Sequence, residues 1–428
     1  MIKVLILSSL IFLLHCSKDT LSPDYPVTGD SAYNLIGKGG YSVGKEIIET
    51  SDGGFLIVGT TNTMGARAQD IYLVKLDQTG HIQWQNTYGD GGNDHGHSVF
   101  QCSDNNYIVC GKIVQNGTDR AAIIKVAPGG DILWQKIIDM AQKVYRSVEL
   151  TSVSTAYSII QDHNNDYVIT GYAIVADTSS ESDNETKHTL FIKMDDQGES
   201  IEYRTFGEQN IQYMDPEYCR GFDIEQTLDG GYVITGFSSQ GLRGPTSMLW
   251  KLTPNGTLEW ERELVYWHTG IKVIPLQNGN YAVCDYVDCE GALYNVSLII
   301  TNYQGYIQIR KSVILDQEKT RPLSCTFCKT SDNHFVFAGE IGFKDSNKSS
   351  MYLLKTDLNG NVKTKVWGNN FRNGMFSIIE TSDQRLAMTG YVVNEKRSYK
   401  NPIYYHVKNP KCKLQFLKTT LDSEIAAK

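Results

Sequence analysis

Three residues that lie close together in the sequence have side chains that could bind a metal ion, namely Asp94, His95 and His97. A zinc site normally needs three or four converging ligands, and no second pair of histidines accompanies this one. His97 also falls at a repeated position that elsewhere holds apolar or aromatic side chains. These are Tyr157, Phe222, Ile271 and Phe376. We therefore interpret His97 as a packed side chain and predict no metal and no cofactor.

Charged side chains at a second repeated position raise the question of acid–base chemistry. Glu46, Asp223 and Lys272 occupy this position, the last two in neighbouring copies of the repeat. The two interpretations are a structural ion pair between Asp223 and Lys272 and a catalytic acid–base pair, and we favour the ion pair. The sequence has no Gly-x-Ser-x-Gly, no His-Glu-x-x-His and no phosphate-binding loop. It therefore predicts no catalytic residue, and we do not expect an enzyme.

These residues belong to a motif that returns seven times. Its clearest copy runs from Glu46 to Gly59, continues through Asp70–Asp77 and ends at His81–Trp84. Four short strands joined by turns, with a period of about fifty to sixty-five residues, are typical of β-propeller blades. The second strand closes with Gly59, Gly111, Gly171, Gly236, Gly339 and Gly390, with Asp285 in the fifth copy. The third strand carries Lys75, Lys125, Lys193, Lys251, Lys355 and Lys408, with Asn302 in the fifth copy.

Apolar and polar side chains alternate in the first strand of each copy, as expected for a strand with two unlike faces. Because the first strand of a propeller blade lies innermost, we predict that the polar side chains line a central channel. These channel-lining residues are Glu46, Ser98, Ser158, Asp223, Lys272, Thr326 and Ser377.

The predicted fold is all-β, a seven-bladed β-propeller of four-stranded antiparallel blades. Residues 33–40 resemble residues 84–91, which lead from one copy to the next, and the seventh copy fades after Lys408. An N-terminal strand is therefore expected to complete the last blade and close the ring, which removes exposed sheet edges. We divide the chain into a signal peptide (1–15), a flexible tether (16–30), the propeller (31–411) and a C-terminal extension (412–428).

Two short motifs in the repeats carry a family resemblance. Asp-Gly-Gly-(Tyr/Phe)-x-(Ile/Val)-x-Gly occurs at 52–59 and 229–236, and Gly-x-(Ile/Leu)-x-Trp occurs at 80–84, 130–134 and 256–260. With them the chain resembles bacterial secreted propeller-repeat proteins of the delta-60-like type over residues 31–410. The resemblance implies the fold and no particular activity. We interpret the Asp and Gly residues as turn formers and not as calcium ligands, because Asp bonds the turn backbone and Gly adopts positive φ.

The N-terminus predicts export and lipidation. Lys3 precedes an apolar run, Val4–Leu14, which is too short to span a membrane and is typical of a secretory signal. Leu13-Leu14-His15-Cys16 resembles a bacterial lipobox, although His15 departs from the usual small residue; an ordinary signal peptide cut elsewhere is the alternative. Ser17-Lys18-Asp19 resembles the tether of surface-exposed Bacteroidota lipoproteins. The resemblance implies lipidation of Cys16, for example with palmitate, and an outer-membrane lipoprotein at the cell surface.

Eight cysteines follow Cys16, and an exported protein can form disulfides. They are Cys102, Cys110, Cys219, Cys284, Cys289, Cys325, Cys328 and Cys412. Cys325 and Cys328 are three apart in one strand and so point to opposite faces, which prevents a bond between them. We interpret the cysteines mainly as buried thiols, with Cys284 and Cys289 as the most plausible bridge.

The links between strands differ on the two faces of the predicted ring. On one face they are short and uniform turns, whereas on the other they are long and irregular, as at 138–156, 172–189, 207–220 and 237–247. Binding residues concentrate on variable loops held by a rigid scaffold, so we predict recognition on the long-loop face, near the second to fourth copies and the channel mouth. The candidate binding residues are aromatic, Arg or His side chains: Tyr145, Arg146, Tyr213, Tyr218, Arg220, Trp267, His268 and Arg372.

The net charge of −8 and the lack of a basic run argue against a nucleic-acid partner. We predict a surface-anchored or outer-membrane-anchored propeller lipoprotein that serves as a binding or scaffold module for an envelope protein complex, a glycan or a peptide. An outer-membrane transporter or a secretion complex is a candidate partner, and membrane contact is expected through the lipid anchor only. One alternative is an extracellular polysaccharide-acting lyase or hydrolase with its site at the channel mouth; another is a purely structural envelope component. Convergence there of His, Tyr or carboxylate groups with perturbed pKa values would favour the enzyme.

Overall fold

The computed structural model describes residues 32–36, 40–64, 68–139, 144–145, 148–176, 185–207, 218–239, 244–287, 295–313, 320–343, 349–358, 361–367, 373–393 and 412–420. In these ranges every regular element is a β-strand, and no helix occurs. Over the same described residues, nothing has the length and apolar character of a membrane-spanning helix. The fold is therefore all-β, as predicted.

The strands follow the seven sequence repeats. Repeats 1 and 2 contain β2 (Ser42–Glu49), β3 (Phe55–Thr61), β4 (Asp70–Leu76), β5 (Ile82–Tyr88), β6 (His95–Gln101), β7 (Tyr107–Gln115), β8 (Thr118–Val126) and β9 (Ile132–Ile137). Repeats 3 and 4 contain β10 (Val144–Tyr145), β11 (Val148–Gln161), β12 (Tyr167–Ala176), β13 (Glu185–Met194), β14 (Ile201–Phe206), β15 (Tyr218–Gln226), β16 (Tyr232–Ser239), β17 (Pro245–Leu252) and β18 (Leu258–Tyr266). Repeats 5 and 6 contain β19 (His268–Pro275), β20 (Tyr281–Val287), β21 (Val296–Thr301), β22 (Ile307–Val313), β23 (Thr320–Lys329), β24 (Phe335–Phe343), β25 (Ser349–Thr356) and β26 (Val362–Trp367). Repeat 7 contains β27 (Asn373–Glu380), β28 (Arg385–Val393), β29 (Cys412–Thr420) and β1 (Ala32–Ile36).

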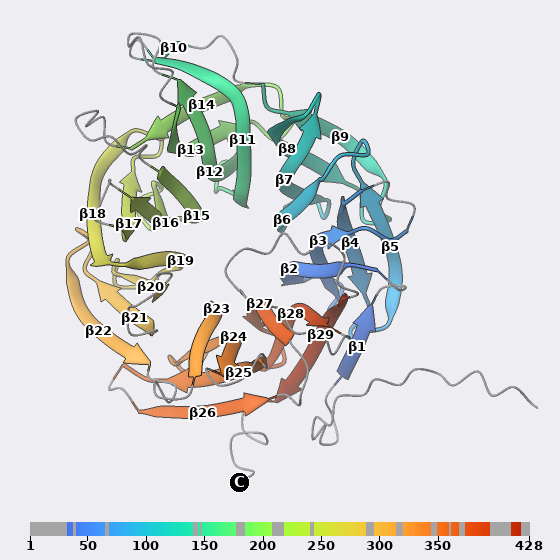
Figure 1. Ribbon diagram of the computed structural model, residues 1–428, viewed down its shortest axis with the longest axis vertical. Coiled ribbons are helices and arrows are strands. Elements are labelled where there is room, and N and C mark those ends of the chain that lie inside the picture. Colours follow the sequence, from blue (N-terminus) through green and yellow to red (C-terminus); the bar gives the residue numbers. More distant parts are fainter. Residues whose placement is uncertain are drawn as a thin grey trace, which may run out of the picture.

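The described strands form six sheets, five of them four-stranded. Repeats 3 and 4 share one nine-stranded sheet, because Lys187 of β13 pairs in parallel with Tyr218 of β15. Within each repeat, successive strands pair antiparallel. Figure 1 shows the sheets arranged around a central space, with the first strand of each repeat nearest to it and the fourth strand outside.

The last sheet combines both ends of the chain. Its strand order is β1-β29-β28-β27, so the N-terminal strand takes the outer position that the sequence predicted for it. The third strand differs from the prediction. Lys408 lies outside the described residues, and Cys412–Thr420 holds the third place in the sheet, so Lys418 is the Lys of this repeat. This part of the predicted C-terminal extension therefore belongs to the sheet.

Paired charges mark the turn between the first and second strands. Asp52 accepts a hydrogen bond from the Gly54 amide at 3.0 Å, and Gly53 has φ of 75°, which confirms the predicted turn chemistry. The same carboxylate also pairs with the buried Lys75 ammonium at 2.8 Å. Equivalent pairs are Lys125–Asp104, Lys251–Asp229, Lys355–Asp332 and Lys418–Asp383. In repeat 3, Lys193 pairs instead with Asp162, which stands at the position of Thr50. In repeat 5 the predicted equivalent was Asn302, but the strand register places Ile300 there, opposite Ala282.

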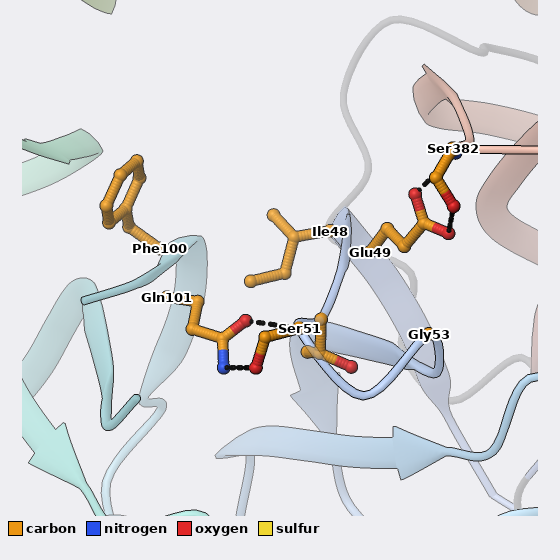
Figure 2. A pocket seen from close by; sticks show the side chains of 8 residues that line it. Ile48, Glu49, Ser51, Gly53, Phe100, Gln101 and Ser382 are labelled. Carbon is orange, nitrogen blue, oxygen red and sulfur yellow. Dashed lines mark hydrogen bonds between the residues drawn. The ribbon is translucent and has the colours of Figure 1, made fainter. Parts of the chain in front are cut away.

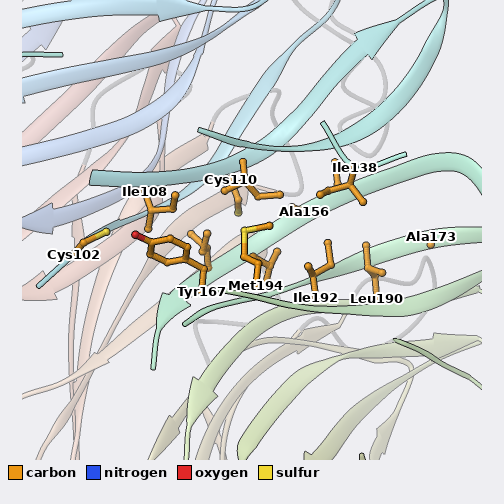
Figure 3. Close-up of a cluster of buried hydrophobic side chains, with 14 residues drawn as sticks. Cys102, Ile108, Cys110, Ile138, Ala156, Tyr167, Ala173, Leu190, Ile192 and Met194 are labelled. Atoms are coloured by element: carbon orange, nitrogen blue, oxygen red, sulfur yellow. The ribbon is translucent and has the colours of Figure 1, made fainter. Parts of the chain in front are cut away.

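The apolar core lies between neighbouring sheets. Figure 3 shows one cluster in which side chains of repeat 2, such as Ile108 and Cys110, meet side chains of repeat 3, such as Tyr167 and Met194. Six of the seven cysteines in the described ranges are buried and unbridged in this structure, as predicted: Cys102, Cys110, Cys219, Cys284, Cys325 and Cys328. Each sheet therefore depends on its neighbour to cover its apolar face.

Candidate functional site

The polar residues of the first strands tie neighbouring repeats together. A polar side chain in one repeat accepts a hydrogen bond from a backbone amide in the next. These bonds are Glu46 Oε2 with Val99 N (2.8 Å), Ser98 Oγ with Ile159 N (3.2 Å), Ser158 Oγ with Ile224 N (3.4 Å), Asp223 Oδ2 with Val273 N (2.9 Å) and Ser377 Oγ with Ile47 N (3.3 Å). Thr326 is buried, and Lys272 has no acceptor atom for such a bond. We call these contacts the inner hydrogen-bond set.

The carboxylates of Glu46, Asp223 and Glu225 act electrostatically on the Lys272 ammonium among these inner strands. Burial raises the pKa of Asp223 to about 6, although Lys272 and the Val273 amide oppose the rise. Burial would lower the pKa of Lys272, but Asp223, Glu46 and Glu225 outweigh it and raise the value. The predicted ion pair is not formed: among the described residues, Lys272 has no carboxylate oxygen within 4.0 Å of its ammonium nitrogen.

Glu225 was missed in the sequence analysis. It lies two residues beyond Asp223, at a position that is apolar in the other repeats: Ile48, Phe100, Ile160, Ile274, Cys328 and Ile379. Burial, followed by repulsion from Asp223, raises the pKa of Glu225 to about 8. A carboxylate at a repeated position that is apolar in the other six repeats was the sequence signal that could have identified Glu225.

A β-bulge places a second row of side chains beside the first. The register shifts between Gly96 and Ser98, between Ala156 and Ser158, and between Gly221 and Asp223. The extra residues at these bulges are His97, Tyr157 and Phe222, and a bulge re-aims the side chain that it carries. The shared sequence position of these three residues therefore has a backbone cause.

The three bulge residues pack together with two further side chains. The ring of Tyr157 lies 5.0 Å from that of His97, 5.2 Å from that of Phe222 and 6.0 Å from that of Tyr172, between centroids. The guanidinium carbon of Arg220 lies 4.9 Å from the centre of the Tyr172 ring. We call His97, Tyr157, Tyr172, Arg220 and Phe222 the aromatic cluster. It joins repeats 2, 3 and 4, the region where the sequence predicted recognition.

Burial keeps His97 and Tyr157, two titratable side chains of the aromatic cluster, uncharged near neutral pH. Burial, helped by His95, Lys45 and Lys112, lowers the pKa of His97 well below its usual value, so its imidazole is neutral and can accept a proton. Burial raises the pKa of Tyr157 to about 12 against the opposing charge of Arg220, so its phenol keeps its proton. A proton acceptor, a proton donor and a guanidinium therefore meet here. Among the described residues no group of three or more His, Cys, Asp or Glu could hold a metal ion.

The other predicted binding residues are spread out. Tyr218 is 37% exposed and has the Lys187 ammonium 5.0 Å from its ring centre. Trp267 is 47% exposed, whereas His268 is buried beside Asp285, 3.1 Å from its carboxylate, and so is not a surface contact. Tyr145 lies in β10, but its side chain, like Arg146, Tyr213 and Arg372, lies outside the described part of the structure. Among the predicted binding residues with described side chains, Arg220 is the one that belongs to the aromatic cluster.

A cavity of about 530 Å³ lies at the turns between first and second strands, lined by Ile48, Glu49, Thr50, Ser51, Gly53, Phe100, Gln101 and Ser382. Figure 2 shows that its polar side chains bond to one another. Gln101 accepts from the Ser51 amide at 2.7 Å, and Glu49 accepts from the Ser382 amide at 2.7 Å. We call these and the equivalent bonds Ser103–Gln161, His163–Gln226 and Ser331–Glu380 the turn hydrogen-bond set. The cavity thus lies between structural contacts, and the aromatic cluster is the better candidate site.

Comparison with known proteins gives a fold and no family. No family model matches the sequence, and no curated protein matches it. A solved structure of a protein of unknown function from Dyadobacter fermentans DSM 18053 is similar, with a TM-score of 0.52 and 9% identity over 91% of this chain and 98% of that one. An ulvan lyase of polysaccharide lyase family PL25, solved bound to -[GlcA(1-4)Rha3S]-, has a TM-score of 0.54 and 11% identity over 89% of this chain and 94% of that one. At these identities the likeness concerns the fold alone.

Proposed function

We propose that the seven repeats form a seven-bladed β-propeller closed by the N-terminal strand. Two contacts join the first and last repeats: Ile47 N donates to Ser377 Oγ, and Ser382 N donates to Glu49. The pairing of β1 with β29 supports the same closure. In such a ring the aromatic cluster would lie at one mouth of the channel.

The function that this geometry supports best is binding of an acidic glycan at the aromatic cluster. The observation that carries the proposal is Arg220, half-buried and lying over Tyr172 beside Tyr157 and Phe222. A guanidinium binds a carboxylate through two parallel hydrogen bonds, and aromatic walls with few polar groups are typical of small-ligand sites. A uronic acid offers both a carboxylate and an apolar sugar face. The ulvan lyase with a similar fold binds a glucuronate-containing chain, which supports the choice of ligand.

Isothermal titration with a glucuronate–rhamnose oligosaccharide tests this proposal. We expect Arg220→Gln to weaken binding by at least about tenfold, since hydrogen bonds to charged groups contribute about 1.5–3 kcal/mol. Arg262→Gln is the matched control, because Arg262 also lies over aromatic rings, those of Trp260 and Tyr306, but on the outer strand β18. Equal binding by both variants, or equal binding of a carboxyl-reduced oligosaccharide, would contradict the proposal.

A second candidate function is eliminative cleavage of that glycan, favoured by the proximity of His97 and Tyr157. In this reaction neutral His97 would take the proton next to the uronate carboxylate, whose charge Arg220 would balance. The electron pair forms a carbon–carbon double bond, the adjacent glycosidic carbon–oxygen bond breaks, and the Tyr157 phenol would protonate the leaving oxygen. Ultraviolet absorbance of the conjugated product would detect cleavage. His97→Gln should then abolish product formation and leave titrated binding intact, whereas absence of product in the wild type would leave the binding function alone.

We also propose that Cys16 carries a lipid that anchors the protein to the outer membrane, with the ring at the cell surface. The lipobox-like Leu13-Leu14-His15-Cys16 supports this. Fractionation should find wild-type protein in membranes and Cys16→Ala protein in soluble fractions; equal fractionation would refute the anchor. An envelope transporter or secretion complex as partner would be found by affinity capture from solubilised membranes.

A further inference from the structure

Two cysteines on neighbouring sheets face each other. Cys284 lies in β20 of repeat 5 and Cys325 in β23 of repeat 6, 41 positions apart in sequence, and their sulfur atoms are 2.9 Å apart. Both belong to one buried apolar cluster, and they are 0% and 5% exposed. By contrast, Cys102 and Cys110, which lie in the cluster of Figure 3, have no sulfur contact with each other. The contact between Cys284 and Cys325 therefore joins repeats 5 and 6 directly.

Among the described residues, the junction of repeats 5 and 6 lacks both kinds of hydrogen bond that tie other repeats together. In the inner set, Lys272 stands where an acceptor for the Phe327 amide would be needed, and an ammonium cannot accept. In the turn set, Lys329 stands where repeats 1, 2, 3, 4 and 7 have Gln or Glu, so among the described residues the Gln277 amide has no side-chain acceptor there. Every other junction between consecutive repeats, including that of repeats 7 and 1, has at least one such bond among the described residues. A different crosslink at this one junction would substitute for them.

We propose that Cys284 and Cys325 form a disulfide that joins repeats 5 and 6 in the exported protein. The two thiols lose two protons and two electrons to a disulfide oxidant, such as a thiol-disulfide oxidase of the envelope or a small-molecule disulfide, which is reduced to two thiols. The attacking group is a thiolate. Because burial raises the pKa of the Cys284 thiol well above its usual value, the bond must form while the chain folds and the thiols are still exposed. The new bond would bring the sulfur atoms to about 2.05 Å.

Peptide mapping of the full-length protein purified from the envelope tests this proposal. The protein is denatured with an alkylating reagent and no reductant, then digested with trypsin. Cys284 shares its tryptic peptide with Cys289, and Cys325 shares its own with Cys328, so fragmentation spectra must assign the bond. We expect a Cys284–Cys325 crosslink and alkylation of Cys102, Cys110, Cys219 and Cys328. Alkylation of both Cys284 and Cys325, or a bond from Cys284 to Cys289, would overturn the proposal.

Variants separate the bond from effects on folding. The crosslink should persist in Cys289→Ala and in Cys328→Ala and should be lost in Cys325→Ala, each protein being recovered in native form. A reducing agent should lower the denaturant midpoint of the wild type and leave that of Cys284→Ala/Cys325→Ala unchanged. Equal sensitivity of the two proteins to the reducing agent would show that the pair is not bridged.

Discussion

Repeats 1 and 5 form the same hairpin with different side chains. In repeat 1 the turn hydrogen bond from Thr50 N to Gly54 O is 2.9 Å, and in repeat 5 the bond from Leu276 N to Asn280 O is 2.8 Å. Repeat 1 adds the ion pair of Lys75 with Asp52. Repeat 5 has Ile300 and Asn278 at those two positions, so both partners have been replaced together. The backbone turn therefore does not need the ion pair, but a buried cation at this position needs its carboxylate.

The two repeats also differ at the Gly of the second strand. Gly59 pairs with Gly44, and a Cβ atom on Gly59 would lie 1.9 Å from the carbonyl oxygen of Val43. In repeat 5 the same register pairs Gly270 with Asp285, which fits a side chain that packs against His268. The two strands therefore approach this closely where the second strand has Gly, but the strand pair also forms with Asp at that position.

The largest effect on stability is expected for Gly59→Ala, which adds a side chain at the close backbone approach of repeat 1. Because the Cβ would meet backbone and not a movable side chain, we expect a loss of more than about 3 kcal/mol in the free energy of unfolding. Urea unfolding followed by fluorescence measures it. Gly129→Ala is the matched control, since nothing lies within 4 Å of its added Cβ. Equal stability of the two variants would show that the strands can separate at little cost.

A smaller effect is expected when the charge of repeat 1 is copied into repeat 5. Ile300→Lys places an ammonium at a 4% exposed position opposite the turn, where Asn278 offers no negative charge. An unpaired buried charge is strongly destabilising, so we expect a loss of about 3 kcal/mol. Adding Asn278→Asp should restore about 1 kcal/mol of this loss in the same unfolding assay. Failure of the second substitution to rescue the first would mean that the two positions are not coupled.

The fold was largely predictable because each strand has its own local pattern. Alternation and turn residues located the first strands, and the buried cysteines and the shared position of His97 and Tyr157 were recognised from the same pattern. The third strand of repeat 7 was misplaced because Lys408 and Lys418 both follow apolar residues, and only pairing with β28 selects Lys418. The aromatic cluster was not predicted as a unit, since its members converge through packing between three repeats.

The inner strands of repeats 4 and 5 differ in charge. Repeat 4 carries the carboxylates of Asp223 and Glu225, and repeat 5 carries the Lys272 ammonium that acts on them. The pKa of Glu225 is raised to about 8, above the ordinary value of 4.5 expected in the unfolded chain. A raised carboxyl pKa adds stability that is complete below about pH 4.5 and is lost as the pH rises through 8. Glu225→Gln should therefore have a free energy of unfolding about 2 kcal/mol higher than that of the wild type at pH 9 and an equal one at pH 4. Denaturant unfolding at the two pH values measures the difference. Identical pH profiles would show that Glu225 ionises freely.

The smallest effect is expected for the ion pair that distinguishes repeat 1. Asp52 is half-exposed, and although burial opposes the shift, its bonds to Lys75, Thr50 and Gly54 lower its pKa to about 2. Its contribution is thus complete above about pH 4 and is lost as the pH falls through 2. A double-mutant cycle of Asp52→Asn and Lys75→Ile should give a coupling of about 1 kcal/mol at pH 7 and a smaller one at pH 2, where Asp52 is partly protonated. The coupling is small because the exposed Asp52 carboxylate is screened by water. The double variant reproduces the chemistry of repeat 5, and it should therefore be more stable than Asp52→Asn alone, in which Lys75 stays buried without its carboxylate. If Asp52→Asn alone were the more stable variant, a buried lysine without its carboxylate would not be destabilising. The loss of both partners in repeat 5 would then need another explanation.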